Sequence, residues 1–476
     1  MSILTTSLFM QPTVGVGYHN IGGGVLRASH MDMIKKLEAH YGERCGHLPL
    51  DAEHLYVLIA LHTPTIDAQI SYLSTLIGKP MHAVTETELQ QALSRYGTDA
   101  ALIVPYINVP QSAEWIQSTF KSTTWGLAPS MVDILKNKAS FYTFLDAFEL
   151  DGWRTPDYRI AQFADLQQVA QAFLGEIEEL LSTAALPEYP LGIMMRAAES
   201  DGNYGSCLLY QEHGRIHLIP NGDALLRTTY MTWQEALVDA QKILATTMDL
   251  AKESRIVLSR YLDLAESPGL SLVLMHGEVV SLRWNGQLQE KGSKACVGTS
   301  TYQASTQALA QLREEYEPRT VELFTGLLRH IACHCGVDFS TLRGLANIDI
   351  MLPGPLEIAL QRKRGMQVCG YIAECNPRWT NYTDAIMAVI GANRQQPTVG
   401  QMLSTIEHGI LSVDKYEIPV HIDAQQLRAR IADVDQQLKR EGTRIICRMA
   451  THPFGVIFAG DVTRARQELA RIIAAM

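Results

Sequence analysis

The run Ile372-Ala-Glu-Cys-Asn-Pro-Arg-Trp-Thr-Asn381 constrains the fold of this chain more than any other stretch. It begins as an apolar strand and carries Glu374, Asn376 and Arg378 at alternate positions. Alternate side chains of an extended strand lie on the same face. A carboxylate and an amide on one face offer the oxygen ligands that Mg²⁺ prefers, and an arginine beside them can bind a phosphate group. The run therefore predicts a strand that ends in a site for a hard cation and an anion.

A second acidic residue, Asp349, interrupts the apolar run of residues 345–352. A polar connection separates this run from the strand that holds Glu374, so we expect two neighbouring strands that each contribute one carboxylate to a shared metal ion. The pattern also fits an alternative, in which Glu374 is a solvated acid of an edge strand and Asp349 belongs to a local turn. Asp338 is a rival for the metal acid, but it follows a helical pattern and is expected to cap a turn.

The length and charge of the chain limit its functions. A chain of 476 residues is too long for one hydrophobic core and predicts two or three domains. Its net charge of −10 argues against a nucleic-acid or anionic-membrane partner. No stretch reaches the ~20 uninterrupted apolar residues of a membrane span, and the start of the chain lacks a basic segment followed by an apolar one. We therefore expect a cytoplasmic protein that does not contact a membrane.

Two small clusters are interpreted as structural. Cys333 and Cys335 are close together, but no second pair lies at zinc-finger spacing, so we expect them on a helix face. The run Gly22-Gly-Gly24 does not fit the G-x-G-x-x-G pattern, so a flexible turn is favoured over a phosphate loop.

Local patterns divide the chain into three domains. Residues 1–125 alternate strand-like and helix-like runs, which predicts a small parallel α/β domain. Residues 126–394 combine helical patterns with a β-rich middle, and residues 395–476 contain short α/β elements. A helical pattern over 305–335 is expected to break at Pro318, because proline removes a helical hydrogen bond.

A hairpin is predicted in the middle of the chain. A strand over 191–197 leads into the glycine-containing segment 199–206, and a return strand follows over 207–211. The backbone N–H groups of such a loop can cover the phosphates of a nucleotide. By itself, a glycine-containing hairpin is usually only a hairpin.

The order of these pieces resembles the ATP-grasp superfamily over roughly residues 100–390. The resemblance rests on several segments: residues 104–110, residues 125–130, the helix with Lys138, the hairpin at 199–206, Asn347-Ile-Asp349 and Glu374-Cys-Asn376-Pro-Arg378. It implies an α/β fold with α+β lobes, in which an ATP-grasp domain lies between an N-terminal Rossmann-like pre-ATP-grasp domain and a small C-terminal α/β domain. One lobe would comprise residues 126–190 with 295–394, and the central nucleotide lobe residues 191–262.

Within that superfamily, the chain looks most like the peptide ligases of the pheganomycin-biosynthesis type. Ser267-Pro-Gly-Leu-Ser-Leu272 and the following Gly277-Glu-Val segment are similar to the S-P-x-x-x-L and G-E-V segments of that group. The regions that flank the ATP-grasp domain also resemble the flanking domains of these ligases.

The superfamily resemblance implies a set of binding roles. Asp349, Glu374 and Asn376 would hold Mg²⁺, with Mn²⁺ as an alternative, and Arg378 would stabilise the transferring phosphoryl group or the tetrahedral intermediate. The remaining roles concern ATP: Lys138 and Arg196 on the phosphates, the loop residues Gly202, Asn203, Gly205 and Ser206 over them, Glu266 at the ribose, and the backbone of Ser259, Arg260 and Tyr261 at the adenine.

Two positions depart from the family pattern. Arg196 stands where a second phosphate-binding lysine is expected, and its planar guanidinium differs in shape from an ammonium group. The adenine-binding segment, which is usually acidic, contains Ser259 and Arg260. Neither departure removes a metal ligand, so we expect activity to be retained.

The resemblance implies an ATP-dependent carboxylate–amine ligase that forms an amide through an acyl phosphate and releases ADP and phosphate. Its substrates would be an amino acid and a second amino acid or peptide, in a step of natural-product assembly, and the protein would form a homodimer. The same nucleotide residues would also serve a kinase, a thiol ligase or a non-catalytic ATP-binding regulator.

Overall fold

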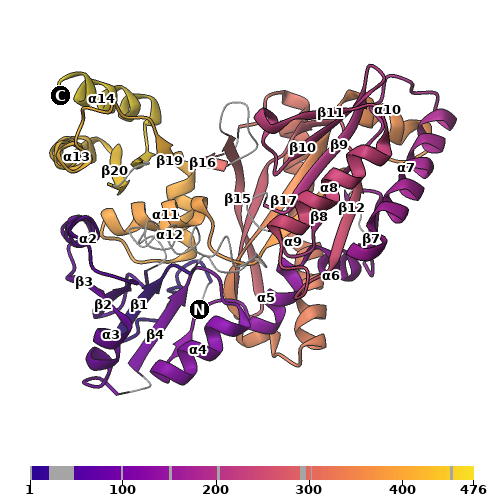
Figure 1. The fold of residues 1–476 in the computed structure, drawn as a ribbon. Coiled ribbons are helices and arrows are strands. Elements are labelled where there is room, and N and C mark those ends of the chain that lie inside the picture. The colour runs from indigo at the N-terminus through magenta and orange to yellow at the C-terminus, as the bar shows by residue number, and fades with distance from the viewer. Residues whose placement is uncertain are drawn as a thin grey trace.

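The computed structural model describes residues 3–20, 48–97, 100–148, 153–200, 204–289, 296–301, 303–450 and 454–476. Within these ranges the strands form three sheets, which Figure 1 shows with their helices. The expected fold class, an α/β protein with α+β lobes, is confirmed. Among the described helices, none is both long enough and apolar enough to cross a membrane.

The first sheet is parallel and belongs to the N-terminal part of the chain. Its strand order is β3 (Met81–Val84), β2 (His54–Leu58), β1 (Val14–Tyr18), β4 (Ala101–Pro105) and β5 (Thr123–Thr124). The helices between these strands are α2 (Pro64–Ile77), α3 (Glu86–Leu93) and α4 (Pro110–Phe120). The predicted alternation of strands and helices is confirmed here. The carboxyl ends of β1 and β4 lie toward the rest of the molecule.

The second sheet is antiparallel and has six strands among the described residues, in the order β11 (Thr228–Tyr230), β10 (Arg215–Pro220), β9 (Ser206–Glu212), β8 (Gly192–Ala197), β12 (Arg255–Arg260) and β7 (Tyr158–Gln162). Helices α7 (Leu166–Thr183) and α8 (Trp233–Thr247) share a buried apolar cluster with one face of this sheet. We call this unit the nucleotide lobe. Its other face is turned toward the third sheet (Figure 1).

The third and largest sheet runs through the centre of the molecule. Its strands are β20 (Arg444–Met449), β21 (Phe454–Ala459), β19 (Ile410–Tyr416), β16 (Cys296–Thr301), β15 (Glu278–Gln289), β14 (Gly269–Met275), β17 (Arg343–Pro353), β18 (Gly370–Asn376) and β6 (Trp153–Arg154), with β13 (Leu264–Glu266) paired to β17. The connecting helices are α5 (Pro129–Lys136), α6 (Lys138–Leu145), α9 (Gln307–His334), α10 (Pro355–Lys363), α11 (Asn381–Ala392), α12 (Val399–Glu407), α13 (Ala424–Leu438) and α14 (Val462–Ala474).

Strands β14, β17 and β18 are almost fully apolar because both faces of the large sheet are covered in this region. Ile348 and Ile350 pack on one face with residues of α5, α6 and α9, whereas Leu345 and Val273 pack on the other with residues of α11 and the N-terminal part. A polar side chain within these strands is therefore taken out of water, and it needs a partner. This requirement makes the acids of β17 and β18 unusual.

Three details of the sequence interpretation differ from the structure. Helix α9 continues through Pro318, because Tyr316 and Phe324 on either side of the proline pack into one buried cluster and outweigh the lost hydrogen bond. The helix expected with Lys138 begins only at that lysine, after a break at Asn137, whose side chain caps α6 by accepting a hydrogen bond from Ser140 N. The lobe boundary also differs, because β7 pairs with β12 and α7 packs beside it in the nucleotide lobe.

The last part of the chain is joined to the large sheet through the pairing of β16 with β19. Strands β19, β20 and β21, with helices α13 and α14, have an apolar cluster of their own. The boundary placed at residues 394–395 stays a prediction.

Candidate functional site

The acids of the two central strands face each other across a hydrogen-bonded ladder. Strand β17 pairs antiparallel with β18, and its register places Asp349 opposite Glu374 and Asn347 opposite Asn376. Neighbouring residues such as Ile348 and Cys375 point to the opposite face and are buried in the apolar cluster there. The structure therefore brings Asp349, Glu374 and Asn376 together, as the alternation of the sequence predicted.

A row of hydrogen-bonded amide side chains holds Asp349 in place. Asn376 Nδ2 donates to Asp349 Oδ2 over 3.1 Å, and Asn347 Nδ2 donates to Asp349 Oδ1 over 2.7 Å. The side-chain oxygen Oδ1 of Asn347 in turn accepts hydrogen bonds from Ser271 Oγ at 3.0 Å and from Asn285 Nδ2 at 2.9 Å. These neighbours fix the orientation of the carboxylate before any ligand binds.

The two carboxyl groups have very different pKa values. Burial and the adjacent charge of Glu374 raise the pKa of Asp349 well above its usual range. Burial also opposes ionisation of Glu374, but the charges of Lys138 and Arg196 outweigh it and hold the pKa of Glu374 at about 2. A cation placed between the two acids would allow both to ionise, because it would offset their mutual repulsion.

Two cations from outside the large sheet converge on Glu374. Lys138 begins α6, and its Nζ lies 3.1 Å from Glu374 Oε2 while donating to the carbonyl oxygen of Ser200 over 2.6 Å. Arg196 lies on β8 of the nucleotide lobe, and its Nη1 is 3.5 Å from the same carboxylate oxygen. Arg196 Nη2 donates to Tyr142 Oη over 2.9 Å. Both predicted phosphate-binding cations therefore lie at the predicted metal site.

Arg378 lies two residues after the end of β18 and contacts Asn376, which is bonded to Asp349. Its Nη2 donates to Asn376 Oδ1 over 3.2 Å, and its Nη1 donates to Tyr106 Oη over 3.1 Å. The guanidinium also lies over the Tyr106 ring, 5.4 Å from its centroid. Because Tyr106 comes directly after β4, the N-terminal sheet contributes to the position of this arginine.

The base of the glycine-containing hairpin is well defined. Gly205 has a φ of +73°, and a Cβ there would lie 2.5 Å from Met248 Sδ, so a larger residue would be strained and would clash. Gly205 N donates to Asn221 Oδ1 over 3.0 Å, and the adjacent Ser206 is buried at the start of β9. Gly202 and Asn203, at the predicted tip, lie outside the described residues.

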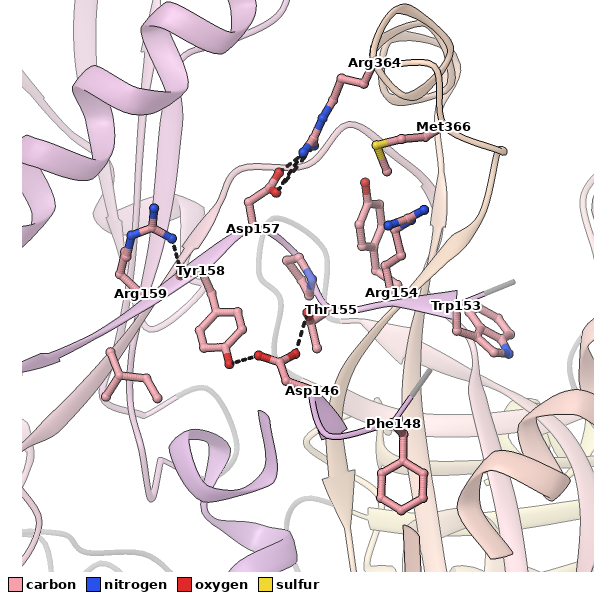
Figure 2. A pocket seen from close by; sticks show the side chains of 13 residues that line it. Asp146, Phe148, Trp153, Arg154, Thr155, Asp157, Tyr158, Arg159, Arg364 and Met366 are labelled. Carbon is pink, nitrogen blue, oxygen red and sulfur yellow. Dashed lines mark hydrogen bonds and ion pairs between the residues drawn. The ribbon is translucent and has the colours of Figure 1, made fainter. Parts of the chain in front are cut away.

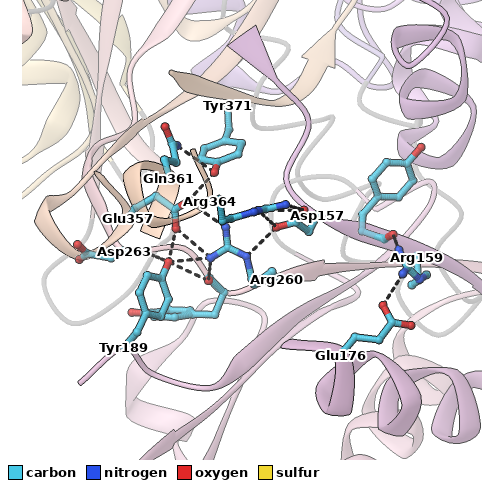
Figure 3. Close-up of polar contacts among 12 residues, drawn as sticks. Asp157, Arg159, Glu176, Tyr189, Arg260, Asp263, Glu357, Gln361, Arg364 and Tyr371 are labelled. Carbon is cyan, nitrogen blue, oxygen red and sulfur yellow. Dashed lines mark hydrogen bonds and ion pairs between the residues drawn. The ribbon is translucent and has the colours of Figure 1, made fainter. Parts of the chain in front are cut away.

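The predicted adenine-binding segment is occupied by a buried ion cluster, shown in Figure 3. The side chain of Arg260 is fully buried; it binds Glu357 through two 2.9 Å contacts and Asp157 through a third. Asp157 also pairs with Arg364 at 3.0 Å. We call these four residues, with Tyr189, the hinge cluster.

The backbone of the same segment is also engaged within the protein. Arg260 N donates to Asp157 O, and Tyr261 N donates to Gly192 O, both over 2.9 Å. Ser259 is paired on both sides within the sheet. Because these backbone groups already bond within the protein, they give no support to the predicted contact of residues 259–261 with adenine.

Glu266, the predicted ribose contact, accepts a hydrogen bond from Ser305 N over 2.8 Å, so its carboxylate anchors the start of the segment that leads to α9. Asp338, the rival metal acid, accepts from Ser340 N at 2.9 Å and caps a short turn at Phe339–Thr341, as expected. It is not part of the acid pair.

One pocket gathers four of the predicted residues. Lys138, Glu374, Asn376 and Arg378 line it together with Lys136, Glu199 and Ser200, which the sequence interpretation did not single out. Lys136 lies 3.5 Å from Glu199. The nearest sequence signal was the Lys-Asn-Lys run at 136–138, where a second lysine precedes the predicted phosphate ligand by two positions.

The donor set fits a hard cation that is bound with a polyphosphate. Among the described residues there is no group of three or more His, Cys, Asp or Glu side chains at metal-binding spacing. The site instead offers two carboxylates and an amide, which suits Mg²⁺, because this ion usually takes one or two carboxylates and completes its shell with water and phosphate oxygens. The raised pKa of Asp349 supports the same reading, since the second acid is not neutralised by the protein alone.

Comparisons with known proteins concern the fold alone. No family model matches the chain, and no curated protein does. Similar solved structures include N5-carboxyaminoimidazole ribonucleotide synthetase in complex with ADP, at 12% identity, TM-score 0.48 and 98% coverage of both chains. The synthase of Aspergillus clavatus in complex with ADP and 5-aminoimidazole ribonucleotide has 11% identity, TM-score 0.47, and coverage of 98% of this chain and 100% of the other. A biotin carboxylase–ATP complex from Campylobacter jejuni has 10% identity, TM-score 0.49, and coverage of 87% and 83%.

Likeness at this level assigns no activity to the chain. The fold has the order of parts that the ATP-grasp resemblance implied: a parallel α/β domain precedes two mainly antiparallel sheets. The acids of the large sheet meet Lys138 of α6 and Arg196 of the nucleotide lobe.

Proposed function

We propose that this chain is an ATP-dependent ligase of the ATP-grasp type that joins a carboxylate to an amine. One observation carries the proposal: the cross-strand pair Asp349–Glu374 lies where Lys138 and Arg196 converge. Two acids and an amide on adjacent strands, with Lys138 and Arg196 beside them, fit a magnesium–triphosphate complex. A purely structural ion cluster would balance its charges internally, and this one leaves Asp349 uncompensated.

The proposed roles follow from the chemistry of each side chain. Asp349, Glu374 and Asn376 would hold Mg²⁺, which, when bound, offsets negative charge on phosphate oxygens. Lys138 and Arg196 now share Glu374, and they would turn to the phosphates once a cation occupied that carboxylate. Arg378 already has an orientation fixed by Tyr106 and would bind the anionic group that forms at the reacting carboxylate.

The reaction that we propose has two chemical steps. The substrate carboxylate takes the γ-phosphoryl group of ATP, which forms an acyl phosphate and releases ADP. The substrate amine then attacks the acyl carbon, loses a proton and expels phosphate, which leaves an amide. The protein would contribute mainly positioning and electrostatic stabilisation. The hairpin between β8 and β9 would limit the access of water to the acyl phosphate.

The finer assignment rests on the sequence resemblance to peptide ligases of the pheganomycin-biosynthesis type. It proposes that the carboxylate and the amine both belong to amino acids or short peptides, that the product serves natural-product biosynthesis, and that the protein acts in the cytoplasm as a homodimer. None of these features is needed for the chemistry of the acid pair.

The proposal is tested by nucleotide release. The full chain is incubated with ATP and Mg²⁺ and with amino acids and short peptides, singly and in pairs, and the products are identified by mass. We expect ADP and phosphate only with a carboxylate–amine pair, together with a product lighter than the pair by one water. Release of AMP and pyrophosphate would contradict the proposal, because it would indicate adenylation.

A further inference from the structure

Tyr142 is a residue of helix α6 that contacts Arg196 and is not one of the proposed ligands. It lies four positions after Lys138, and residues that far apart share one face of a helix. Lys138 reaches the Glu374 carboxylate, and Tyr142 reaches the arginine that pairs with the same carboxylate. One face of α6 therefore contacts both members of the Arg196–Glu374 ion pair.

The Tyr142 hydroxyl donates one hydrogen bond and accepts another. The side chain is fully buried, and its Oη donates to the carbonyl oxygen of Ala373 over 2.8 Å. A tyrosine hydroxyl carries one hydrogen, so only its lone pairs remain for a second partner. That partner is Arg196, whose Nη2 donates to Oη over 2.9 Å. Burial raises the pKa of Tyr142, although the charge of Arg196 opposes the shift, so the hydroxyl keeps its proton and both bonds keep their direction.

The ring of Tyr142 is enclosed as well. It belongs to the buried apolar cluster that α5, α6 and α9 form with the large sheet. Tyr158 of β7 meets the ring in an edge contact, with 4.8 Å between the ring centroids. Figure 2 shows Tyr158 on the wall of a separate pocket, where its own hydroxyl is bonded to Asp146. Tyr142 therefore contacts the large sheet and two strands of the nucleotide lobe, and it has little freedom to move.

Arg196 has more hydrogen-bond donors than the protein satisfies. A guanidinium carries five N–H donors in one plane. Its Nη1 lies 3.5 Å from Glu374 Oε2, which is longer than an ordinary N–H···O hydrogen bond, whereas Nη2 lies 2.9 Å from Tyr142 Oη. Among the described residues, no group accepts a hydrogen bond from the buried Nε of this arginine. The contact with Tyr142 therefore sets the plane of the guanidinium, and other donors remain available to an anion.

An arginine at this position depends on such a contact more than a lysine would. The sequence resemblance predicts a lysine here, and a lysine ammonium is a compact point charge with rotatable donors. A guanidinium has its donors in a rigid planar fork, so its orientation decides which oxygens it can bind. A cation bound at Glu374 would also weaken the attraction between Glu374 and Nη1. Tyr142, which is neutral, would then remain the partner that orients Arg196.

We propose that Tyr142 is a positioning residue for Arg196: its hydroxyl holds the guanidinium in the plane in which the remaining donors bind a phosphate oxygen of ATP. Tyr142 does not touch the nucleotide and acts through the arginine. The inference rests on the proposed function, because it takes Arg196 as a phosphate ligand. It adds the residue that allows an arginine to stand in the place of a lysine, and it holds for any acceptor of the phosphoryl group.

Nucleotide binding by the full chain tests the proposal without knowledge of the other substrates. The probe is the β,γ-imido analogue of ATP with Mg²⁺, which carries three phosphates and is not turned over, and binding is measured by calorimetry. Tyr142→Phe keeps the ring and removes the hydroxyl. We expect it to weaken binding at least ~10-fold, because the guanidinium loses the hydrogen bond that orients it.

Two further variants control for effects on packing. Tyr158→Phe is the matched change in the neighbouring ring, whose hydroxyl bonds to Asp146, and it should leave binding unchanged. Incorporation of 4-aminophenylalanine at position 142 keeps a donor for the Ala373 carbonyl but supplies a poor acceptor. This variant should fold like the parent chain and show the same loss of binding as Tyr142→Phe.

A double-mutant cycle with Arg196→Met separates positioning from a general effect on the fold. Arg196→Met alone should weaken binding at least ~10-fold, and adding Tyr142→Phe should change it by less than ~2-fold, since no guanidinium remains to be oriented. The positioning role is overturned if the parent chain binds the analogue and Tyr142→Phe binds it equally well, or if Tyr142→Phe weakens binding by the same factor in both backgrounds. If the parent chain does not bind the analogue, the proposed function itself fails.

Discussion

Two buried charge clusters lie between the lobes of this protein, and they differ in how their charges are balanced. In the hinge cluster, Arg260 and Arg364 face Asp157 and Glu357. Burial alone would raise the pKa values of these acids, but the arginines outweigh it and hold both below their usual range. Each charge in the hinge cluster thus has an opposite charge in direct contact.

At the acid pair, the protein leaves a charge uncompensated. Lys138 and Arg196 both form ion pairs with Glu374. Asp349 accepts hydrogen bonds only from neutral amide groups, and its pKa is raised. Burial opposes ionisation of both Asp349 and Glu357, yet the pKa values of these two acids shift in opposite directions. The comparison teaches that burial of charge does not by itself mark a functional site, and that the two clusters differ in whether the fold supplies each acid with an opposite charge.

The largest expected effect is on turnover. Replacing Glu374 with Gln keeps the shape of the side chain but removes the charge that would hold the cation, so we expect the rate of ADP release to fall at least ~10²–10³-fold. The variant should also be less stable, because Lys138 and Arg196 lose their buried carboxylate, so the rate is measured under conditions in which circular dichroism shows the variant to be folded. Glu176→Gln, which alters an exposed pair, is the control; equal rates in the two variants would show that Glu374 has no catalytic role.

A substitution in the hinge cluster should act mainly on the stability of the fold. Arg260→Met leaves Glu357 buried without its cation, so we expect the free energy of unfolding to fall by about 3–5 kcal/mol. Arg159→Met removes an exposed pair and should cost at most about 1 kcal/mol. Urea unfolding of the two variants measures the difference. If Arg260→Met were as stable as Arg159→Met, the hinge cluster would not stabilise the fold.

A smaller effect concerns pH. Because the pKa of Glu357 is lowered by folding, its contribution to stability is present above the ordinary carboxyl pKa of about 4 and is lost as the pH falls through the lower folded value. Glu357→Gln should be less stable at neutral pH, but it should lose less stability than the parent chain on acidification below about pH 4. Unfolding midpoints across this range check the sign. Parallel curves for the two proteins would contradict the assigned direction of the pKa shift.

The sequence predicted the acid pair well because its determinants are local. Alternation along a strand places Glu374 and Asn376 on one face, and the apolar neighbours of Asp349 indicate a buried strand. The cross-strand register is not local, but two short strands joined by one connection leave few ways to pair. The row of hydrogen-bonded amides from Asn285 to Asn347 was not predicted, because it depends on which strand lies beside β17.

The hinge cluster was not predictable in the same way. Arg260 was interpreted as a departure in an adenine-binding segment, and its acidic partners, Asp157 and Glu357, are distant in the sequence. Nothing near Arg260 in the sequence indicates that two acids will meet it. Pro318 shows the same limit, since the packing of residues on both sides of it keeps α9 continuous.

The most direct test of the acid pair as a metal site is Mn²⁺ binding, followed by electron paramagnetic resonance in the presence of ADP. Mn²⁺ takes the same oxygen ligands as Mg²⁺ and is observed without any substrate. We expect Asp349→Asn to weaken Mn²⁺ binding at least ~10-fold relative to the parent chain, and Asp338→Asn, which alters an exposed turn acid, to leave it unchanged. Equal Mn²⁺ binding by Asp349→Asn and the parent chain would contradict the assignment of this pair as the metal site.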